Sequence, residues 1–215
     1  MEIFSRFLAL IISILLFPIF IVISVASIIF HGPPIIYKQE RYGYKYKVFK
    51  LYKFRTMVLN NGEKISMVED SRITRFGNLL RKSKLDELPQ IYNIIKGDMR
   101  FIGPRPEVKE YFDKNKFDFL KGIKPGISCF ASILFRNESK FLEKIGGKNA
   151  YPEILKVKLE LARYYARQKS FVLDLKLVFF TILSILYSEY SAHLLKNLLP
   201  IEILPETRRF FSRYD

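Results

Sequence analysis

Residues 81–93, RKSKLDELPQIYN, place two adjacent acids, Asp86 and Glu87, directly behind a cluster of cations. Apolar residues recur at helical spacing on both sides of this pair, a pattern typical of amphipathic helices. The upstream set is Phe76, Leu79 and Leu80, and the downstream set is Leu88, Ile91, Tyr92 and Ile95. The stretch therefore predicts two short helices joined near residues 83–86, with the second beginning at about Asp86.

Pro89 and Gly97 support these helix limits. Proline is tolerated in a first turn, where backbone amides have no intrahelical partner, and glycine suits a helix end. Both acids then lie at the positive end of the helix dipole, where they are stable as anions. Because an acid at this place is most often a helix cap, the pair alone does not define a catalytic site.

The composition limits the chain to one domain with room for a membrane element. Its 215 residues include 36 Lys and Arg against 21 Asp and Glu, a net charge of +15. Such a charge favours phosphate-rich or anionic-lipid partners over neutral ones. The single cysteine, Cys129, excludes an internal disulfide framework and fits the reducing side of a membrane; it also suits a small buried position.

Residues 7–30 form a run of 24 uncharged, mostly apolar residues. A straight helix of this length, at about 1.5 Å per residue, would cross a hydrocarbon core of roughly 30 Å. Pro18 interrupts the run, so we expect either a kinked span or a helix that bends and returns. A cleaved signal peptide, favoured by the small residues at 24–26, and a buried core helix are the alternatives. Seven Lys and Arg against one acid in residues 31–60 predict a cytoplasmic body.

The pattern changes at residues 42–57, YGYKYKVFKLYKFRTM, where apolar and polar residues alternate. This period of two predicts a strand or a hairpin. In one continuous strand four cations would share a face, and a turn or bulge would change that register. The four cations are Lys45, Lys47, Lys53 and Arg55. We expect such a face either to bind phosphates or to lie against solvent or lipid headgroups.

Residues 96–107, KGDMRFIGPRPE, predict the end of the second helix, a short strand and then a stiff loop. Pro104 and Pro106 restrict the backbone on either side of Arg105. A guanidinium presented in this way suits bidentate recognition of phosphate, although a proline turn of this kind is more often structural.

The last third of the chain predicts two more helices. The first covers residues 153–169 and has one apolar face, which consists of Ile154, Val157, Leu161 and Tyr165. The second covers residues 171–187 and is apolar apart from Asp174 and Lys176. Only about eleven uncharged residues follow Lys176, too few to cross a membrane, so we expect an interfacial or buried helix. The residues after 187 contain no motif that indicates a function.

Several motifs in this order resemble those of the bacterial sugar transferase family, the monotopic polyprenyl-phosphate phosphoglycosyl transferases. They are Gln39-x-Arg41-x-Gly43, YKFRTM at 52–57, SRITRFGNLLRKSKLDELPQ at 71–90, NIIKGDMRFIGPRPE at 93–107 and KPGIS at 124–128. The likeness runs from about residue 3 to residue 185. It implies transfer of a phosphosugar from a nucleotide-activated sugar, usually a UDP-sugar, to polyprenyl (undecaprenyl) phosphate, with release of the nucleoside monophosphate. It also implies that the N-terminal segment is re-entrant, entering and leaving on the cytoplasmic side.

The resemblance assigns chemistry to the acid pair. Asp86 would attack the sugar-linked phosphate and carry the phosphosugar covalently, while Mg²⁺ bridges the diphosphate. Glu87 would bind the metal together with Asp86 or assist as an acid or base. The basic residues at family positions would contact phosphate or nucleotide, and they are Lys53, Arg55, Arg81, Arg105 and Arg136. Asp174 matches a family LDLK position, where a functional role and a helix-surface salt bridge are both open.

The chain departs from the family pattern after KPGIS. The family continues as Gly-x-Ala-Gln-Val-x-Gly-Arg, whereas this chain has CFASILFR at residues 129–136. Ala131 and Arg136 are kept. The replaced positions are Cys129, Ser132 and Phe135, and Phe17 replaces a family serine before the membrane proline. We expect the differences at residues 129–136 to bear on donor specificity first and on activity second, because the acid pair and the proline loop are intact. The membrane break rests on Pro18, so a re-entrant shape is still expected despite Phe17.

We therefore expect an α/β or α+β fold, mainly helical with a small irregular sheet, a re-entrant N-terminal helix and interfacial amphipathic helices. The expected parts are a membrane element (1–30), a membrane-associated catalytic domain (31–190) and a C-terminal tail (191–215). The expected place is the cytoplasmic face of the bacterial inner membrane, in the first membrane step of glycan or polysaccharide assembly. The expected partners are membrane lipid, the nucleotide sugar and polyprenyl phosphate, without nucleic acid and with homo-oligomerisation left open. The alternative is a non-catalytic basic protein that binds anionic lipid or nucleic acid.

Overall fold

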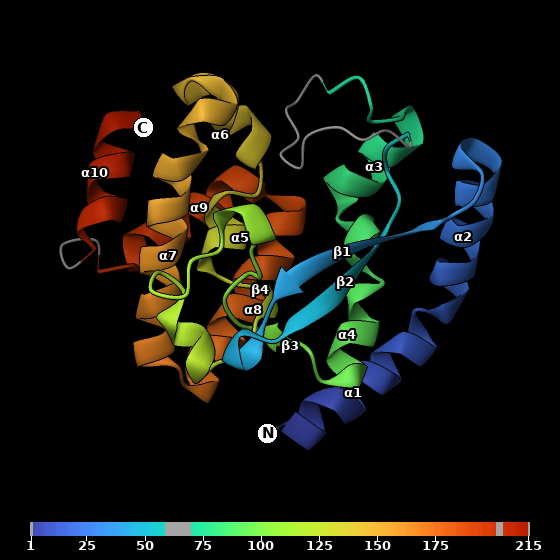
Figure 1. Cartoon of the computed structure of the whole chain (residues 1–215), viewed down its shortest axis with the longest axis horizontal. Coiled ribbons are helices and arrows are strands. Elements are labelled where there is room, and N and C mark those ends of the chain that lie inside the picture. The colour runs from blue at the N-terminus through green and yellow to red at the C-terminus, as the bar shows by residue number, and fades with distance from the viewer. Residues whose placement is uncertain (1, 59–69, 201–203, 215) are drawn as a thin grey trace.

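The computed structural model describes residues 2–58, 70–200 and 204–214, and its helices lie in two groups (Figure 1). The first group contains α1 (Glu2–Leu15), α2 (Phe17–His31), α3 (Arg75–Ser83) and α4 (Gln90–Lys96). The second contains α5 (Phe130–Leu134), α6 (Glu138–Ile145), α7 (Tyr151–Gln168), α8 (Phe171–Leu186), α9 (Ser188–Leu198) and α10 (Pro205–Tyr214). Short 3-10 helices are η1 (Tyr44–Tyr46), η2 (Leu85–Glu87), η3 (Lys109–Tyr111), η4 (Asp118–Lys121) and η5 (Gly147–Ala150). The predicted mainly helical character is confirmed.

Within the described residues, the strands form two small sheets. An antiparallel hairpin joins β1 (Ile36–Tyr42) to β2 (Val48–Phe54), and β3 (Arg100–Ile102) lies parallel to β4 (Gly126–Ser128). The hairpin runs from the end of α2 towards the second group of helices (Figure 1). The predicted small sheet and the short strand after the second helix are therefore both present.

Of the two predictions for residues 42–57, the hairpin is confirmed and the single continuous strand is wrong. The Gly43 amide donates to the Lys47 carbonyl, which closes the hairpin turn, and Lys45 has a left-handed backbone with φ of 52°. Lys45 and Lys47 consequently lie in or beside the turn, whereas Lys53 lies near the far end of β2. The four cations of this segment do not form one strand face.

The break at Pro18 separates α1 from α2, and the two helices are bent by 61°. Pro18 lies in the first turn of α2, where its missing amide removes no helical hydrogen bond. Within the described ranges, no helix alone has the length and apolar composition to cross a membrane, whereas this bent pair meets that test together. Most apolar side chains of the pair are exposed, and its buried residues are Ala9, Ile23 and Ser27.

The first group of helices packs around the hairpin. One core joins Ala9 of α1 and Ile94 of α4 to Leu51 of β2, and a second joins Ile23 of α2 and Leu80 of α3 to Phe54. Gly77 permits α3 to approach the end of β2, because a Cβ there would lie 2.0 Å from the Thr56 carbonyl oxygen. This packing fixes the chain that follows α3, which carries the acid pair.

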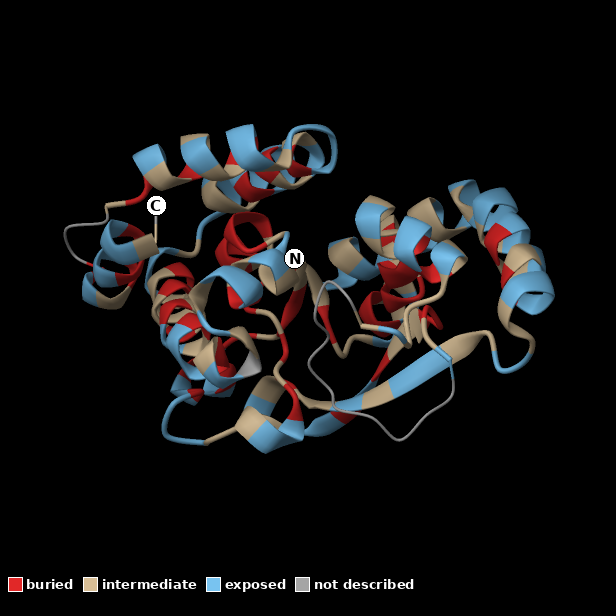
Figure 2. Cartoon of the chain, turned by 90° about the horizontal axis from the view of Figure 1, so that it is seen from above, coloured by how far each residue is buried: buried red, intermediate tan, exposed pale blue. Residues whose placement is uncertain are grey.

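The larger core lies in the second group of helices, where Figure 2 colours many stretches of the ribbon red as buried. The predicted apolar face of α7 is confirmed, since its four residues are at most 1% exposed. They are Ile154, Val157, Leu161 and Tyr165. Leu195 of α9 and Phe210 and Phe211 of α10 belong to the same core, so the last helices are part of this folded unit. Helix α8 buries Leu177, Phe180 and Ser184 and leaves its opposite face exposed.

Candidate active site

The acid pair lies in the 3-10 helix η2, between α3 and α4. Lys84 ends α3 in a left-handed conformation with φ of 60°, and its amide donates to the Arg81 carbonyl. Helix α4 begins at Gln90, so the prediction that the second helix begins at about Asp86 is wrong. Residues 84–88 close successive 3-10 bonds instead, from Glu87 N to Lys84 O and from Leu88 N to Leu85 O. The acids therefore occupy a tight turn rather than the end of an α-helical dipole.

Glu87 is buried and bound by two cations from distant parts of the chain. Its Oε1 accepts from Lys53 Nζ at 3.0 Å and from Arg105 Nη2 at 2.7 Å. Burial by itself raises the pKa of Glu87, but the charges of Arg105, Lys53 and Lys84 outweigh it and hold the pKa well below its usual value. Glu87 is therefore a carboxylate that joins β2 to the proline loop of residues 103–106.

Asp86 is equally buried but differently paired. None of the described residues gives a hydrogen bond to its buried Oδ1. Burial raises the pKa of Asp86; Lys53 and Lys84 lower it, and the Glu87 charge raises it further. The pair thus consists of one carboxylate held by cations and one whose buried Oδ1 receives no hydrogen bond from the described residues.

A cavity of about 730 Å³ adjoins both acids. The structure brings most of the predicted site residues to its walls, from β2, α3, the proline loop and the α5–α6 connection. The predicted residues that line it are Lys53, Arg55, Arg81, Asp86, Glu87, Arg105 and Arg136. Cationic groups and a carboxylate in one cavity suit a phosphorylated ligand.

Arg55 differs from the other cations in its contacts. Its guanidinium donates to backbone carbonyls at the end of α2, with 2.8 Å to Gly32 O, 3.2 Å to Pro33 O and a further bond to His31 O. Arg55 therefore fastens α2 to the hairpin, and none of these bonds reaches the acid pair.

Asp174 does not line the cavity of the acid pair. Its Oδ1 accepts from the Tyr165 hydroxyl at 2.6 Å, which links α8 to α7, and the same hydroxyl lies 3.4 Å from the Ile102 carbonyl. The Asp174 contact is thus a hydrogen bond between helices.

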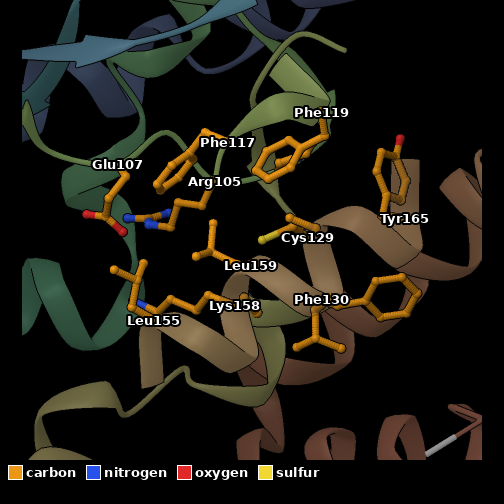
Figure 3. Close-up of a pocket in the computed structure, with 14 residues that line it drawn as sticks. Arg105, Glu107, Phe117, Phe119, Cys129, Phe130, Leu155, Lys158, Leu159 and Tyr165 are labelled. Atoms are coloured by element: carbon orange, nitrogen blue, oxygen red, sulfur yellow. The ribbon is translucent and has the colours of Figure 1, made fainter. Parts of the chain in front are cut away.

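The sequence did not predict a polar network behind Arg105. Arg41 Nη1 lies 3.4 Å from Glu107 Oε1, and the Tyr151 hydroxyl donates to Glu107 Oε2 at 2.7 Å. Lys158 pairs with Glu138 at 2.7 Å on the adjoining wall. Figure 3 shows Glu107, Arg105 and Lys158 around a small cavity of about 20 Å³. Arg41 and Glu107 lie in motifs of the sequence. No pattern in the sequence indicates that they contact each other or that Tyr151 binds Glu107.

The carboxylate oxygens of the acid pair suit a Mg²⁺ ion that takes its other ligands from a bound substrate. Over the ranges that the structure describes, no three His, Cys, Asp or Glu side chains gather into a metal site. Asp86 offers an oxygen without a hydrogen bond, while Glu87 is occupied by Lys53 and Arg105. Mg²⁺ commonly takes one or two protein carboxylates and completes its shell with water and substrate phosphates.

Comparison with known proteins identifies the family. Residues 1–188 match the family model described as bacterial sugar transferase, so the chain belongs to this family of transferases. The resemblance found in the sequence is confirmed, and with it the prediction of an enzyme.

Three relatives illustrate the likeness. The chain is 37% identical over 161 residues to the uncharacterized sugar transferase EpsL of Bacillus subtilis (strain 168), covering 74% of this chain and 73% of that protein. It is 35% identical over 190 residues to the UDP-N-acetylgalactosamine-undecaprenyl-phosphate N-acetylgalactosaminephosphotransferase of Aeromonas hydrophila, covering 83% and 42%. It is 35% identical over 181 residues to the UDP-glucose:undecaprenyl-phosphate glucose-1-phosphate transferase of Klebsiella pneumoniae, covering 80% and 37%. The chain thus spans less than half of each of the latter two relatives.

Proposed function

We propose that this chain transfers a phosphosugar from a UDP-sugar to undecaprenyl phosphate and releases UMP. The observation that carries this proposal is the buried Asp86 carboxylate, with an unbonded oxygen, in a cavity whose walls also bear Lys53 and Arg105. The names of the two longer relatives support a UDP-sugar donor and an undecaprenyl-phosphate acceptor. The product would be the first membrane-linked intermediate in the assembly of a glycan or polysaccharide.

The reaction proceeds in two displacements at phosphorus. Asp86 attacks the sugar-linked phosphate, an acyl-phosphate bond forms, and the bond to the bridging oxygen breaks as UMP leaves. A phosphate oxygen of undecaprenyl phosphate then attacks the same phosphorus and releases the Asp86 carboxylate. Lys53 and Arg105 stabilise the charge that develops on the phosphate oxygens in both steps.

Glu87 holds those two cations in place before the donor arrives. Its Oε1 contacts both Lys53 and Arg105, so a donor phosphate that enters the cavity meets cations already oriented beside Asp86. Magnesium would be held by Asp86 together with the donor phosphates, and it would neutralise diphosphate charge, while Glu87 stays paired with Lys53 and Arg105.

Monophosphate release tests the proposed reaction. The full chain, purified in detergent, is incubated with Mg²⁺, undecaprenyl phosphate and each member of a panel of nucleotide sugars. We expect UMP release from at least one UDP-sugar, and turnover only when undecaprenyl phosphate is present. The panel includes N-acetylgalactosamine and glucose donors, because the relatives differ in this sugar. No release from any donor would favour a binding protein instead.

Arg105→Lys should lower kcat/KM although it keeps the positive charge. The Arg105 guanidinium reaches Glu87 with both terminal nitrogens, at 2.7 and 3.4 Å, a fork that lysine does not reproduce. Losing one such contact costs about 1 to 3 kcal/mol, roughly tenfold to a hundredfold in rate. Steady-state UMP release measures the effect, and Arg163→Lys, at an exposed pair with Asp118, is the matched control. Wild-type kinetics in Arg105→Lys would leave Arg105 a structural role only.

The bent N-terminal pair gives a prediction about topology. If α1 and α2 enter and leave the membrane on the cytoplasmic side, cysteines placed at Ser5 and Lys38 should both resist a membrane-impermeant thiol reagent outside intact cells. The native Cys129 is buried, and replacing it by serine supplies the background. Labelling at position 5 alone would indicate a spanning helix. Pro18→Ala should shift the pair towards that spanning form, because it restores the missing amide at the bend.

A further inference from the structure

Four hydroxyl groups gather on one wall of the large cavity. Ser128 ends β4, Ser132 lies in α5, and Thr181 and Ser184 lie on α8, which is otherwise almost entirely apolar. Ser128 Oγ contacts Thr181 Oγ1 and lies 3.4 Å from Ser132 Oγ. All four residues line the cavity that holds the acid pair. We call Ser128, Ser132, Thr181 and Ser184 the hydroxyl wall.

The protons of the hydroxyl wall are already engaged within the protein. A backbone carbonyl oxygen only accepts hydrogen bonds, so a hydroxyl next to one must donate. Ser132, Thr181 and Ser184 each donate in this way, at 2.9, 2.6 and 2.7 Å. Their acceptors are the carbonyls of Cys129, Leu177 and Thr181. Since Thr181 has given its proton to a carbonyl, Ser128 must be the donor in the contact between them.

The wall therefore offers acceptors to a ligand. A hydroxyl oxygen has two lone pairs. One lone pair of Ser132 accepts from Cys129 N, one of Thr181 accepts from Ser128, and one of Ser184 accepts from Arg136 Nη1. Lone pairs remain on all four oxygens. A fully ionised phosphate has no proton to donate to them, and a prenyl chain would leave them unsatisfied. A sugar hydroxyl or an acetamido N–H satisfies them.

Arg136 connects this wall to the acid pair. Its Nη1 donates to Ser184 Oγ at 3.4 Å, and its Nη2 donates to the carbonyl of Lys82, close before η2. Arg136 and both acids line the same cavity. Burial lowers the pKa of Arg136, and the Glu87 charge opposes this shift in part. The wall thus lies on the α8 side of the space that Asp86 faces.

We propose that the sugar of the donor lies against the hydroxyl wall and that Thr181 and Ser184 contribute to the choice of sugar. This assignment rests on the proposed transfer reaction, which places a sugar next to the phosphate that Asp86 attacks. It also gives Ser132, where the chain departs from the family pattern, a place in donor recognition.

Thr181→Val and Ser184→Ala test the proposal by separating the sugar from the nucleotide. Valine keeps the shape of Thr181, and alanine removes the Ser184 oxygen alone. Dissociation constants of UDP and of the best UDP-sugar are measured by calorimetry on the full chain in detergent, with a metal chelator present so that no adduct forms during the titration. We expect each variant to weaken the UDP-sugar about tenfold, the effect of one lost hydrogen bond, and to change UDP by less than about twofold. Ser191→Ala is the matched control, since Ser191 is a buried serine on α9 that donates to the Phe180 carbonyl outside this wall.

Donors with fluorine in place of single sugar hydroxyls sharpen the test, because fluorine cannot donate. The analogue that lacks the contacting hydroxyl should bind wild type about tenfold more weakly and lose nothing further with Thr181→Val. Any of three results would overturn the proposal. The variants could weaken the binding of UDP and of the UDP-sugar equally, change only the KM of undecaprenyl phosphate, or leave both affinities unchanged. Wild type could bind the UDP-sugar more tightly than UDP, lose that preference in the variants and yet release no UMP. Such a result would support this sugar site and reject the transfer reaction. A wild type that binds no UDP-sugar would reject both.

Discussion

Asp86→Asn should fold as the wild type does and lose essentially all turnover. An amide oxygen is a poor nucleophile towards phosphorus, whereas asparagine keeps the shape of aspartate. The fold should tolerate the change, because the raised pKa of Asp86 means that its charged form is disfavoured in the folded protein above the unfolded pKa. A neutral side chain of equal size avoids that cost. We therefore expect a thermal midpoint at neutral pH equal to or above that of the wild type.

The covalent intermediate gives a direct measurement. Wild type incubated with its UDP-sugar and Mg²⁺, without undecaprenyl phosphate, should gain the mass of one phosphosugar, and peptide mapping should place it on residues 85–90. Chelation of the metal should abolish the adduct, and Asp86→Asn should form none. Asp118→Asn, an exposed carboxylate paired with Arg163, is the control. Near wild-type turnover in Asp86→Asn or an adduct on Glu87 would contradict the assignment, and turnover without an adduct would favour direct attack by undecaprenyl phosphate.

Glu87→Gln should lower turnover by roughly a hundredfold, the scale for losing one electrostatic contact in an active site. It should also destabilise the protein, because Lys53 and Arg105 lose the buried carboxylate that both contact. Removing one partner of a buried ion pair costs about 3 to 5 kcal/mol. The same unpaired cations should attract phosphate more strongly, so the variant should bind UDP at least as tightly as wild type does.

Two measurements separate these effects of Glu87→Gln. Chemical denaturation gives the free energy of unfolding, and the rise in thermal midpoint on adding UDP reports nucleotide binding to the folded state. We expect a larger UDP-induced rise in the variant than in wild type. Glu40→Gln, at the exposed pair with Lys109, should change neither quantity appreciably. Weaker UDP binding together with unchanged stability would show that Glu87 does not orient these cations.

Local patterns in the sequence predicted the elements that depend on neighbouring residues. The apolar face of α7, the break at Pro18 and the end of α4 at Gly97 all follow from spacing or backbone chemistry within one or two turns. The hairpin turn was ambiguous, because the alternation of residues 42–57 continues through it. The start of α4 was misplaced because Lys84 adopts a left-handed conformation that helix propensities do not reveal.

The candidate site was predictable where a motif marks a residue and not where a contact joins distant segments. Asp86, Glu87 and Arg105 lie in motifs, and the structure places them around one cavity. The carbonyl partners of Arg55 lie more than twenty positions upstream, and the contact of Tyr151 with Glu107 spans 44 positions. Such pairings depend on tertiary packing, which a single sequence does not specify locally.

The packing of α9 and α10 bears on how the protein is produced for study. The family match ends at residue 188, yet Leu195, Phe210 and Phe211 beyond it complete the core around α7. A recombinant fragment cut at the end of the match would remove these side chains and leave the apolar face of α7 partly uncovered. We expect that fragment to aggregate when expressed. Residue 188, where the family match ends, is therefore not a suitable end point for a recombinant fragment.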